Sequence, residues 1–337
     1  MQYKRLVSFG CVNICMIDYR KTENRKDAFL YWCDWSIRNH DVDPALWLLN
    51  YLFDRFEHNI EQKYWIAWIY GTTYHLPAAW IIWNEFPDYE LVDQDRLQWW
   101  NDENYKRLRY QTDTKYNKGY LPQQFASYRK WINHNNESGN QRTRFANIVE
   151  KKSFKFAWDT ISKNLYKFGR YSTWYYLQTL KDCVGVDLVP NDLKLSDYSG
   201  SRSHRNGLCF ALGKDDWIDK KLHKSCIEYL HYESLAMQSE LTDKYGTVMD
   251  LYQMETLLCS FKKLFRKSRG RYLGYYLDRQ AEEIKKVEQD DWWGIDWQVF
   301  WDAREETLQK KQYESKKIRD ELYPVFLNTG TLEYNTI

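Results

Sequence analysis

Apolar side chains recur at helical spacing through the first third of the chain. Between residues 25 and 69 they fall three and four positions apart, which predicts two or three helices. The pair Asp43-Pro44 is typical of a helix start, with a capping residue followed by a first-turn proline. The stretch 72–77 then interrupts the apolar run, and 78–86 resumes it as a short helix that ends at the next proline. The interruption and the proline that follows the second helix predict a tight helix–turn–helix.

Further helices are expected along the rest of the chain. The strongly periodic ranges are 95–105, 154–180 (interrupted at Gly169), 225–245, 247–264, 272–288 and 299–322. The turn-rich stretches are 133–144 and 188–213. We therefore expect about ten to twelve helices in a mainly α, multi-helix bundle with little or no sheet. Residues 1–337 would form a single compact helical domain, either undivided or in two lobes (about 1–132 and 145–325) joined by the loop 133–144, with a tail at 326–337.

The composition supports long elements with few breaks. The chain has 14 Gly and 6 Pro, against 28 Tyr, 17 Trp and 15 Phe. Few Gly and Pro favour helices over a many-turned β-sandwich. So many Tyr and Trp exceed what a core needs, and we expect some to line a groove or stack on flat ligands. Since 49 Lys and Arg nearly balance 47 Asp and Glu, any nucleic-acid surface must come from local clustering.

Several common functions lack their sequence signatures. The 7 cysteines are scattered without a CxxC pair, so neither a disulfide framework nor a zinc ribbon is indicated. The chain has no P-loop and no GxGxxG, GxSxG or HExxH motif, which argues against ATP-driven catalysis, hydride transfer and zinc-dependent deamination. No stretch reaches the length of a membrane span, and we expect a cytoplasmic protein without a membrane partner.

Four short segments combine basic residues, hydroxyls and turn formers: 105–115, 168–174, 197–207 and 261–279. The third contains three Ser, two Gly, two Arg and one His, a composition suited to a loop that cradles an anion. The fourth has six basic residues between 262 and 271 and no acid. Phosphate donors, aromatic rings and few acids in the same loops are what a single-stranded or flipped nucleotide requires.

Each of these features also has a purely structural explanation. A basic run such as 262–271 is typical of a solvated helix end. The Trp/Tyr stripes at 64–70, 80–83 and 174–176 have the spacing of core residues. His75, directly before a turn, is typical of a hydrogen-bonded core histidine. Only the co-occurrence of donors and rings in the same loops favours a binding site.

The most specific stretches of the chain are 108–114, 168–173, 197–207 and 270–279, and 64–80 is also characteristic. In these stretches the chain resembles a bacteriophage family, the alpha-glutamyl/putrescinyl thymine pyrophosphorylases, also called amino acid:DNA transferases, in its second clade. The resemblance runs from about residue 28 to 307. It implies hypermodification of thymine in phage DNA. A separate kinase first pyrophosphorylates hydroxymethyluracil in the DNA, and the family enzyme then replaces the pyrophosphate with the amine of an amino acid or polyamine.

The resemblance also implies a fold and partners. The family is a distant relative of the helix-hairpin-helix DNA glycosylases, with 188–213 as the hairpin-like portion. The expected partners are double-stranded DNA that contains modified uracil, with the target base flipped out, and a free amino acid or polyamine. The expected location is the cytoplasm of the infected bacterial host. Cofactor and metal dependence stay open: Mg²⁺ is possible because it often accompanies pyrophosphate, but the sequence assigns no metal ligands.

The implied reaction assigns roles to residue types in these loops. Pyrophosphate needs cationic and hydroxyl donors, for which the candidates are Arg109, Lys115, Ser201, Arg202, Ser203 and Arg205. Proton transfer from the incoming ammonium needs a carboxylate or a histidine, and the catalytic candidates are Asp113, Asp197 and His204. For stacking on the base the candidates are Tyr171, Trp174 and Tyr198, and for the amino-acid carboxylate Arg170 and Arg271. The candidates for the DNA backbone are Lys262, Lys263, Arg266, Lys267 and Arg269.

Two other functions stay open at this point. One is a glycosylase-like base-processing enzyme, in which water attacks the sugar carbon beside an activating Asp. The other is a non-catalytic DNA-binding protein that uses the same groove. The loops contain more phosphate-type donors than base removal needs, which favours transfer. The identity of the amine (Gly, Ser, Lys or putrescine) also stays open, because it depends on a pocket only a few atoms wide.

Overall fold

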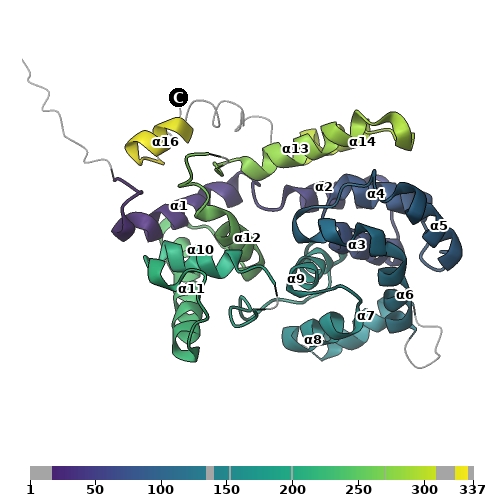
Figure 1. The fold of residues 1–337 in the computed structure, drawn as a ribbon, viewed down its shortest axis with the longest axis horizontal. Coiled ribbons are helices and arrows are strands. Elements are labelled where there is room, and N and C mark those ends of the chain that lie inside the picture. The colour runs from purple at the N-terminus through teal and green to yellow at the C-terminus, as the bar shows by residue number, and fades with distance from the viewer. Residues whose placement is uncertain are drawn as a thin grey trace, which may run out of the picture.

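The computed structural model describes residues 17–133, 140–151, 153–198, 200–268, 270–308 and 323–332. Within these ranges the protein consists of α-helices with short 3₁₀ and π turns and has no strand, which confirms the mainly α fold (Figure 1). The α-helices are α1 (Arg25–Arg38), α2 (Pro44–Arg55), α3 (Ile60–Thr73), α4 (Leu76–Glu85), α5 (Gln94–Asn104), α6 (Leu121–Ile132), α7 (Gln141–Glu150), α8 (Phe154–Asn164), α9 (Arg170–Thr179), α10 (Ser203–Ala211), α11 (Lys224–Tyr245), α12 (Leu251–Phe261), α13 (Tyr275–Glu288), α14 (Gln298–Thr307) and α16 (Tyr323–Thr329).

These fifteen α-helices in the described ranges exceed the roughly ten to twelve that the periodicity predicts. The excess includes helices in stretches of turn-rich composition. Helix α7 begins inside the expected loop 133–144, and α10 occupies part of the expected turn region 188–213. Most of the charged helix expected at 299–322 lies outside the described residues beyond 308.

Helix α3 lies at the centre of the core. Its last ten residues are all buried, and it contacts α4, α7 and α9. The rings of Trp65 and Trp68 stack with centroids 5.1 Å apart, and Trp68 also stacks on Tyr128 of α6 at 4.9 Å. The aromatic stripes at 64–70 and 174–176 are therefore buried, as their helical spacing predicts.

Two glycines allow helices to approach closely. A Cβ atom on Gly71 would lie 2.8 Å from Cβ of Tyr176, where α3 packs on α9. A Cβ on Gly207 would lie 1.9 Å from the carbonyl oxygen of Leu258, where α10 packs on α12. No side chain fits at either distance. Gly207 therefore serves helix packing, although its sequence surroundings suggest an anion-binding loop.

The start of α2 differs from the expected cap. Pro44 is the first helical residue, as predicted, but Asp43 has a φ of +46° and makes no side-chain cap. Its carboxylate instead accepts hydrogen bonds from the Tyr74 hydroxyl at 3.1 Å, from Gln178 Nε2 at 2.9 Å and from the Thr256 hydroxyl at 2.9 Å. These bonds tie the start of α2 to the end of α3 and to α9 and α12.

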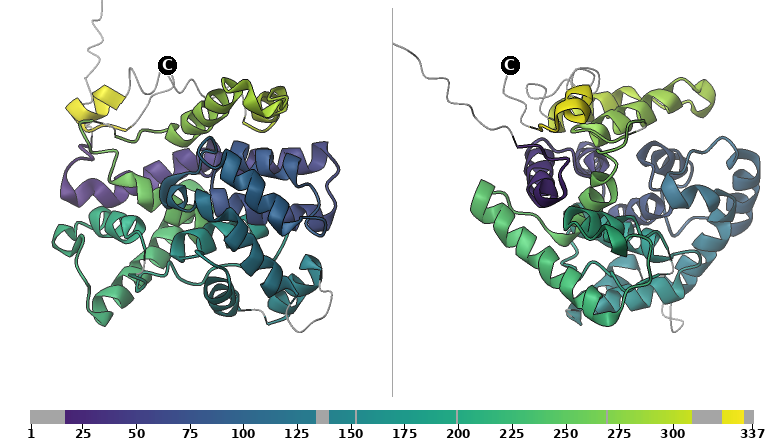
Figure 2. Two further views of the ribbon diagram at one scale, coloured as in Figure 1. Left: turned by 45° about the vertical axis from the view of Figure 1, so that its right-hand side comes forward. Right: turned by 60° about the vertical axis from the view of Figure 1, so that its left-hand side comes forward.

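Helices from distant parts of the sequence lie side by side. Helix α1 contacts α10, α11 and α12, whereas α2 contacts α13 and α14. Figures 1 and 2 show α13 and α14 running along one side of the molecule next to α2, and α11, which has 22 residues, along an outer edge. This arrangement brings loops that are far apart in the sequence to one place.

Candidate active site

The four segments singled out in the sequence meet at one cavity of about 200 Å³. Segment 105–115 contributes a 3₁₀ turn, and segments 168–174 and 197–207 contribute the starts of α9 and α10. Segment 261–279 contributes the loop after α12 and the first turn of α13. The cavity is lined by Tyr74, Thr112, Asp113, Arg170, Tyr171, Tyr175, Ser201, Ser203, Cys259, Lys263, Arg271, Tyr276 and Arg279.

Helix N-termini make the cavity favourable for anions. Arg170 and Tyr171 form the first turn of α9, and Gly169 before them provides no side-chain cap. At the start of α10, the Ser201 hydroxyl accepts a hydrogen bond from Ser203 N at 3.3 Å. The backbone N–H groups and the partial positive charge of helix N-termini both attract negative groups. Two helix starts at one cavity therefore add to the charge of its basic side chains.

Arg170 is held by a fully buried ion pair. Its Nη2 donates to Glu255 Oε1 at 2.7 Å, and both side chains are 0% exposed. Burial alone would lower the pKa of Arg170, but the Glu255 carboxylate outweighs it and raises this pKa. The Nε and Nη1 atoms of Arg170 have no hydrogen-bond partner among the described residues. Arg170 therefore stays charged and has donors left for a ligand.

Lys263 and Arg271 lie at the two ends of a closed loop, in which Arg271 N donates to the Lys263 carbonyl oxygen at 3.0 Å. Burial, with the positive charge of Arg271 second, lowers the pKa of Lys263 to about 8. Burial likewise lowers the pKa of Arg271, whose guanidinium stacks on the Tyr275 ring at 3.4 Å. Cations destabilised by burial and by neighbouring positive charges favour a bound anion. The sequence pattern predicts Lys263 on the DNA backbone, but its side chain lines the cavity.

Arg279 separates the cavity from a wider hollow of about 840 Å³ and lines both. Its Nε donates to Glu283 Oε1 at 2.8 Å. Burial alone would lower the pKa of Arg279, but Glu283 and the neighbouring tyrosines together outweigh burial and raise this pKa, so that the guanidinium stays charged. A fixed positive charge thus lies between the two spaces.

Tyrosines form an aromatic wall of the cavity. The ring of Tyr74 lies 4.1 Å from that of Tyr175 and 5.3 Å from that of Tyr171. Burial raises the pKa of Tyr171 well above its usual value, so its hydroxyl stays neutral. Tyr74 and Thr112 have φ angles of +46° and +47°, which are uncommon for residues other than glycine. Such backbone strain clusters at sites where a fixed orientation is needed.

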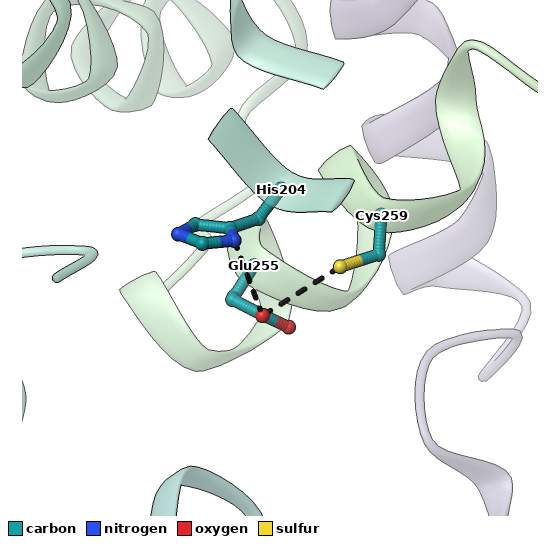
Figure 3. A group of neighbouring side chains, drawn as sticks. All are labelled: His204, Glu255 and Cys259. Carbon is teal, nitrogen blue, oxygen red and sulfur yellow. Dashed lines mark hydrogen bonds and ion pairs between the residues drawn. The ribbon is translucent and has the colours of Figure 1, made fainter. Parts of the chain in front are cut away.

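His204, Glu255 and Cys259 form a compact group next to the cavity, as Figure 3 shows. His204 Nδ1 lies 3.8 Å from Glu255 Oε1, and Cys259 Sγ donates to the same oxygen at 3.6 Å. These residue types could hold a metal ion, but the Arg170 guanidinium already occupies that oxygen and would repel a cation. We therefore assign the group to positioning Arg170.

Three residues of segment 197–207 build the frame of the loop. The guanidinium carbons of Arg202 and Arg205 lie 5.4 Å and 4.0 Å from the centroid of the Tyr198 ring. Both guanidiniums also donate to backbone carbonyl oxygens. The sequence suggests these three side chains for pyrophosphate and base stacking, but none of them lines the cavity, and Ser201 and Ser203 are the polar residues of this segment that do.

Three further candidates do not line the cavity. His204 is fully buried against Glu255, and burial followed by Arg170 lowers its pKa well below the usual value. Trp174 is 0% exposed and packs on Tyr252 at 5.1 Å, so it belongs to the core. Asp197 is half-buried and lies outside the set of lining residues. Successive helical residues point about 100° apart, so a segment that reaches a cavity also sends side chains into the core.

The remaining candidates within the described residues do not line the cavity. Arg109 and Lys115 line the wider hollow. In the loop after α12, Lys262 is half-buried and Arg266 and Lys267 are exposed, while Arg269 lies outside the described residues. Of the expected residues, the cavity unites Asp113, Arg170, Tyr171, Ser201, Ser203, Lys263 and Arg271.

Sequence reasoning missed several residues of the site. Glu255 is the single charged residue of the apolar helix α12, and an isolated acid in such a helix is a usable signal for a buried ion pair. Tyr276 and Arg279 lie inside the recognised fourth segment, but their type alone assigns them no role. Tyr175 belongs to the stripe 174–176, whose other members are core residues, and Tyr74 follows the stripe 64–70, so no sequence signal separates either from the core.

Within the described residues the protein is helical, and its cavity combines cations, hydroxyls and tyrosines, a set of side chains suited to an anionic ligand with a flat ring. The profile of the family described as amino acid:DNA transferase matches residues 27–270, and the chain belongs to this family. The chain is also similar to a protein named serinyltransferase from Salmonella phage ViI, with 29% identity over 311 residues, which cover 86% of this chain and 75% of that relative. No solved structure gives a significant match. No helix in the described ranges has the length and apolar character of a membrane span.

Proposed function

We propose that the protein replaces the pyrophosphate group of 5-(pyrophosphoryloxymethyl)uracil in DNA with the amine of an amino acid. In this reaction the bond between the 5-methylene carbon and the pyrophosphate oxygen breaks, and pyrophosphate leaves with the electron pair. A C–N bond forms at the same carbon, and the amine loses a proton to a base. The observation that supports the proposal is the convergence of cations, hydroxyls, a carboxylate and tyrosines at one cavity.

The leaving group is assigned to the basic side of the cavity. Lys263 and the unpartnered donors of Arg170 supply positive charge, and Ser201 and Ser203 supply hydroxyl donors. The uncapped start of α9 adds backbone N–H groups. Such pre-arranged donors stabilise charge as it develops on the leaving oxygen, and their contribution is larger in a water-poor cavity.

The ring is assigned to the tyrosine wall. Departure of pyrophosphate leaves cationic character on the 5-methylene group, which the conjugated ring delocalises. Tyr74, Tyr171 and Tyr276 present neutral aromatic surfaces, and the face of an aromatic ring attracts a cation. The target base must leave the duplex to reach this wall, at a cost of a few kcal/mol for unstacking.

The amine is assigned to Asp113 and Arg271. Asp113 is exposed at the start of a 3₁₀ turn and lines the cavity, where its carboxylate can bind the ammonium and accept its proton. Arg271 can bind the amino-acid carboxylate through two parallel hydrogen bonds. Arg170 is not assigned this bidentate role, because Glu255 already binds its Nη2. Because a relative bears the name serinyltransferase, serine is the first amine to test.

A mass-based assay tests the proposal. The protein is incubated with DNA that contains pyrophosphorylated hydroxymethyluracil and with a mixture of amino acids. The DNA is then digested, and the masses of the nucleosides are measured by mass spectrometry. An amino-acid adduct with release of pyrophosphate supports the proposal. An abasic site identifies a glycosylase instead, and unchanged DNA overturns both readings. Arg271→Ala should lower adduct formation by at least tenfold, whereas Lys221→Ala, a change at an exposed residue outside the site, should match the wild type.

The same proposal sets the place of action. A reaction on phage DNA takes place in the cytoplasm of the infected bacterial host, with duplex DNA and a free amino acid as partners.

A further inference from the structure

The wider hollow of about 840 Å³ has a distinct charge distribution. The part of its lining that comes from segment 106–118 includes Lys106, Arg107, Arg109, Lys115 and Lys118 and no acid. On the α13 side, the acids Glu282 and Glu283 have cationic partners, Lys286 at 3.2 Å and Arg279 at 2.8 Å, and Asp290 is a third acid of the lining. A chain with a net charge of only +2 thus concentrates positive charge on one wall.

Aromatic rings accompany these cations. The Arg107 guanidinium lies 3.9 Å from the centroid of the Trp292 ring, and Trp292 is 57% exposed. Lys115 Nζ lies 4.8 Å from the centroid of Tyr116, which is 71% exposed. Exposed rings next to basic side chains are typical of surfaces that follow a nucleic-acid strand.

The hollow adjoins the candidate active site. Arg279 lines both spaces, and segment 105–115 passes from the hollow at Gln111 to the cavity at Thr112. A nucleotide in the cavity remains covalently linked to its neighbours, so the flanking strand must leave through an adjoining space. The hollow is also much larger than an amino acid requires.

We propose that this hollow binds the DNA strand that flanks the extruded nucleotide, with Lys106, Arg107 and Lys115 on backbone phosphates. This inference rests on the proposed function, because it takes the cavity as the place of the target base. It moves the main phosphate contacts from the loop at 262–269, where the sequence pattern predicts them, to the segment 106–118. Arg279 then lies at the point where the strand enters the cavity.

A salt titration of DNA binding tests the inference without catalysis. A fluorescent, unmodified duplex with one mismatched pair serves as the probe, and its affinity is measured at several salt concentrations. Each phosphate contact contributes about 0.9 to the slope of log affinity against log salt. The triple variant Lys106→Ala, Arg107→Ala, Lys115→Ala should therefore have a slope smaller by about 2.7. Its affinity should fall by about tenfold or more at moderate salt.

A matched control variant loses the same number of positive charges at another part of the surface. The variant Lys220→Ala, Lys221→Ala, Lys224→Ala removes three exposed lysines outside the hollow and should keep the wild-type slope. An unchanged slope in the first triple variant, or an equal loss in both, overturns the inference. Thermal unfolding checks that the variants are folded.

The outcomes separate this inference from the proposed function. If the wild type forms no adduct but the first triple variant loses its salt slope, the hollow stands and the proposed function fails. If the wild type forms the adduct and the first triple variant keeps both slope and KM for DNA, the proposed function stands and the hollow assignment fails. A raised KM for DNA with an unchanged single-turnover rate at saturating DNA supports both.

Discussion

Lys263 is the residue whose charge depends most on what the cavity contains. Burial and the adjacent Arg271 lower its pKa to about 8 in the free protein. A bound pyrophosphate would reverse this effect, because a nearby anion favours the charged ammonium. Binding of pyrophosphate is therefore coupled to the protonation of one side chain.

The expected result is a pH-dependent affinity for inorganic pyrophosphate. Below pH 8 Lys263 is already charged and binding needs no proton. Above pH 8 binding must take up a proton, so the affinity should fall by up to about tenfold per pH unit. Lys263→Arg keeps its charge to much higher pH and should lose this fall, whereas Lys263→Gln should bind weakly at every pH. Calorimetric titration from pH 6 to 9.5 measures these affinities, and the ionisation of pyrophosphate itself is common to all variants. The same fall in Lys263→Arg as in the wild type would contradict the assignment.

The types of the residues predict part of the site. Which of these residues reach the cavity also depends on the direction in which each side chain points. Ser201, Ser203 and Arg271 line the cavity as their types suggest. Trp174 and His204 are of equally suitable type, but they point into the protein from the same helices that reach the cavity. A single sequence identifies the segment that approaches a ligand. Which side of α9 or α10 faces the ligand depends on how these helices pack against α8 and α12.

At the scale of elements, the start of α13 is fixed by a carboxylate from the beginning of the chain. Asp41 accepts hydrogen bonds from Gly274 N at 2.7 Å, Tyr276 N at 2.9 Å and Leu277 N at 3.1 Å. Burial raises the pKa of Asp41 to about 8, and the three N–H donors oppose this effect. The first turn of α13 carries Tyr276 and is followed by Arg279, so this cap positions two lining residues of the cavity.

Removal of this cap should loosen α13. Asp41→Ala leaves three buried N–H groups without their acceptor, at an expected cost of about 1–3 kcal/mol in the free energy of unfolding. Asp41→Asn should cost less, because an amide oxygen still accepts. Denaturant unfolding measures both, and Asp54→Ala, a change at an exposed residue of α2, serves as the control. The affinity for pyrophosphate should fall in the same order, and equal stability of Asp41→Ala and the control would refute the role of the cap.

Helix positions are predicted well where periodicity is strong and poorly where composition misleads. The ranges expected at 225–245 and 272–288 correspond to α11 (Lys224–Tyr245) and α13 (Tyr275–Glu288). The sequence pattern does not predict helix α10, because its Ser, Asn and Gly content is typical of turns. Its glycine is required by contact with Leu258, a residue far away in the sequence, and local pattern contains no information on that contact.

At the scale of the whole molecule, the candidate site depends on long-range packing. Its lining residues extend from Tyr74 to Arg279, and the helices that support them come from both ends of the chain. The mainly α fold and the family follow from the sequence, but the arrangement of the helices does not. The resemblance to the helix-hairpin-helix glycosylase fold stays a prediction.

A ligand in this cavity should therefore stabilise the whole structure. A molecule that binds the folded form alone adds about 2.7 kcal/mol at a concentration one hundred times its Kd. Inorganic pyrophosphate should raise the Tm, and amide hydrogen exchange should slow together at the 3₁₀ turn around residue 112, at the starts of α9 and α10 and in the loop 263–271. These segments converge on one space, so a single ligand restrains all of them. Sulfate at matched ionic strength controls for general anion effects. Protection confined to one segment would show that the four loops do not form a common pyrophosphate site, whatever the fate of the DNA-binding hollow.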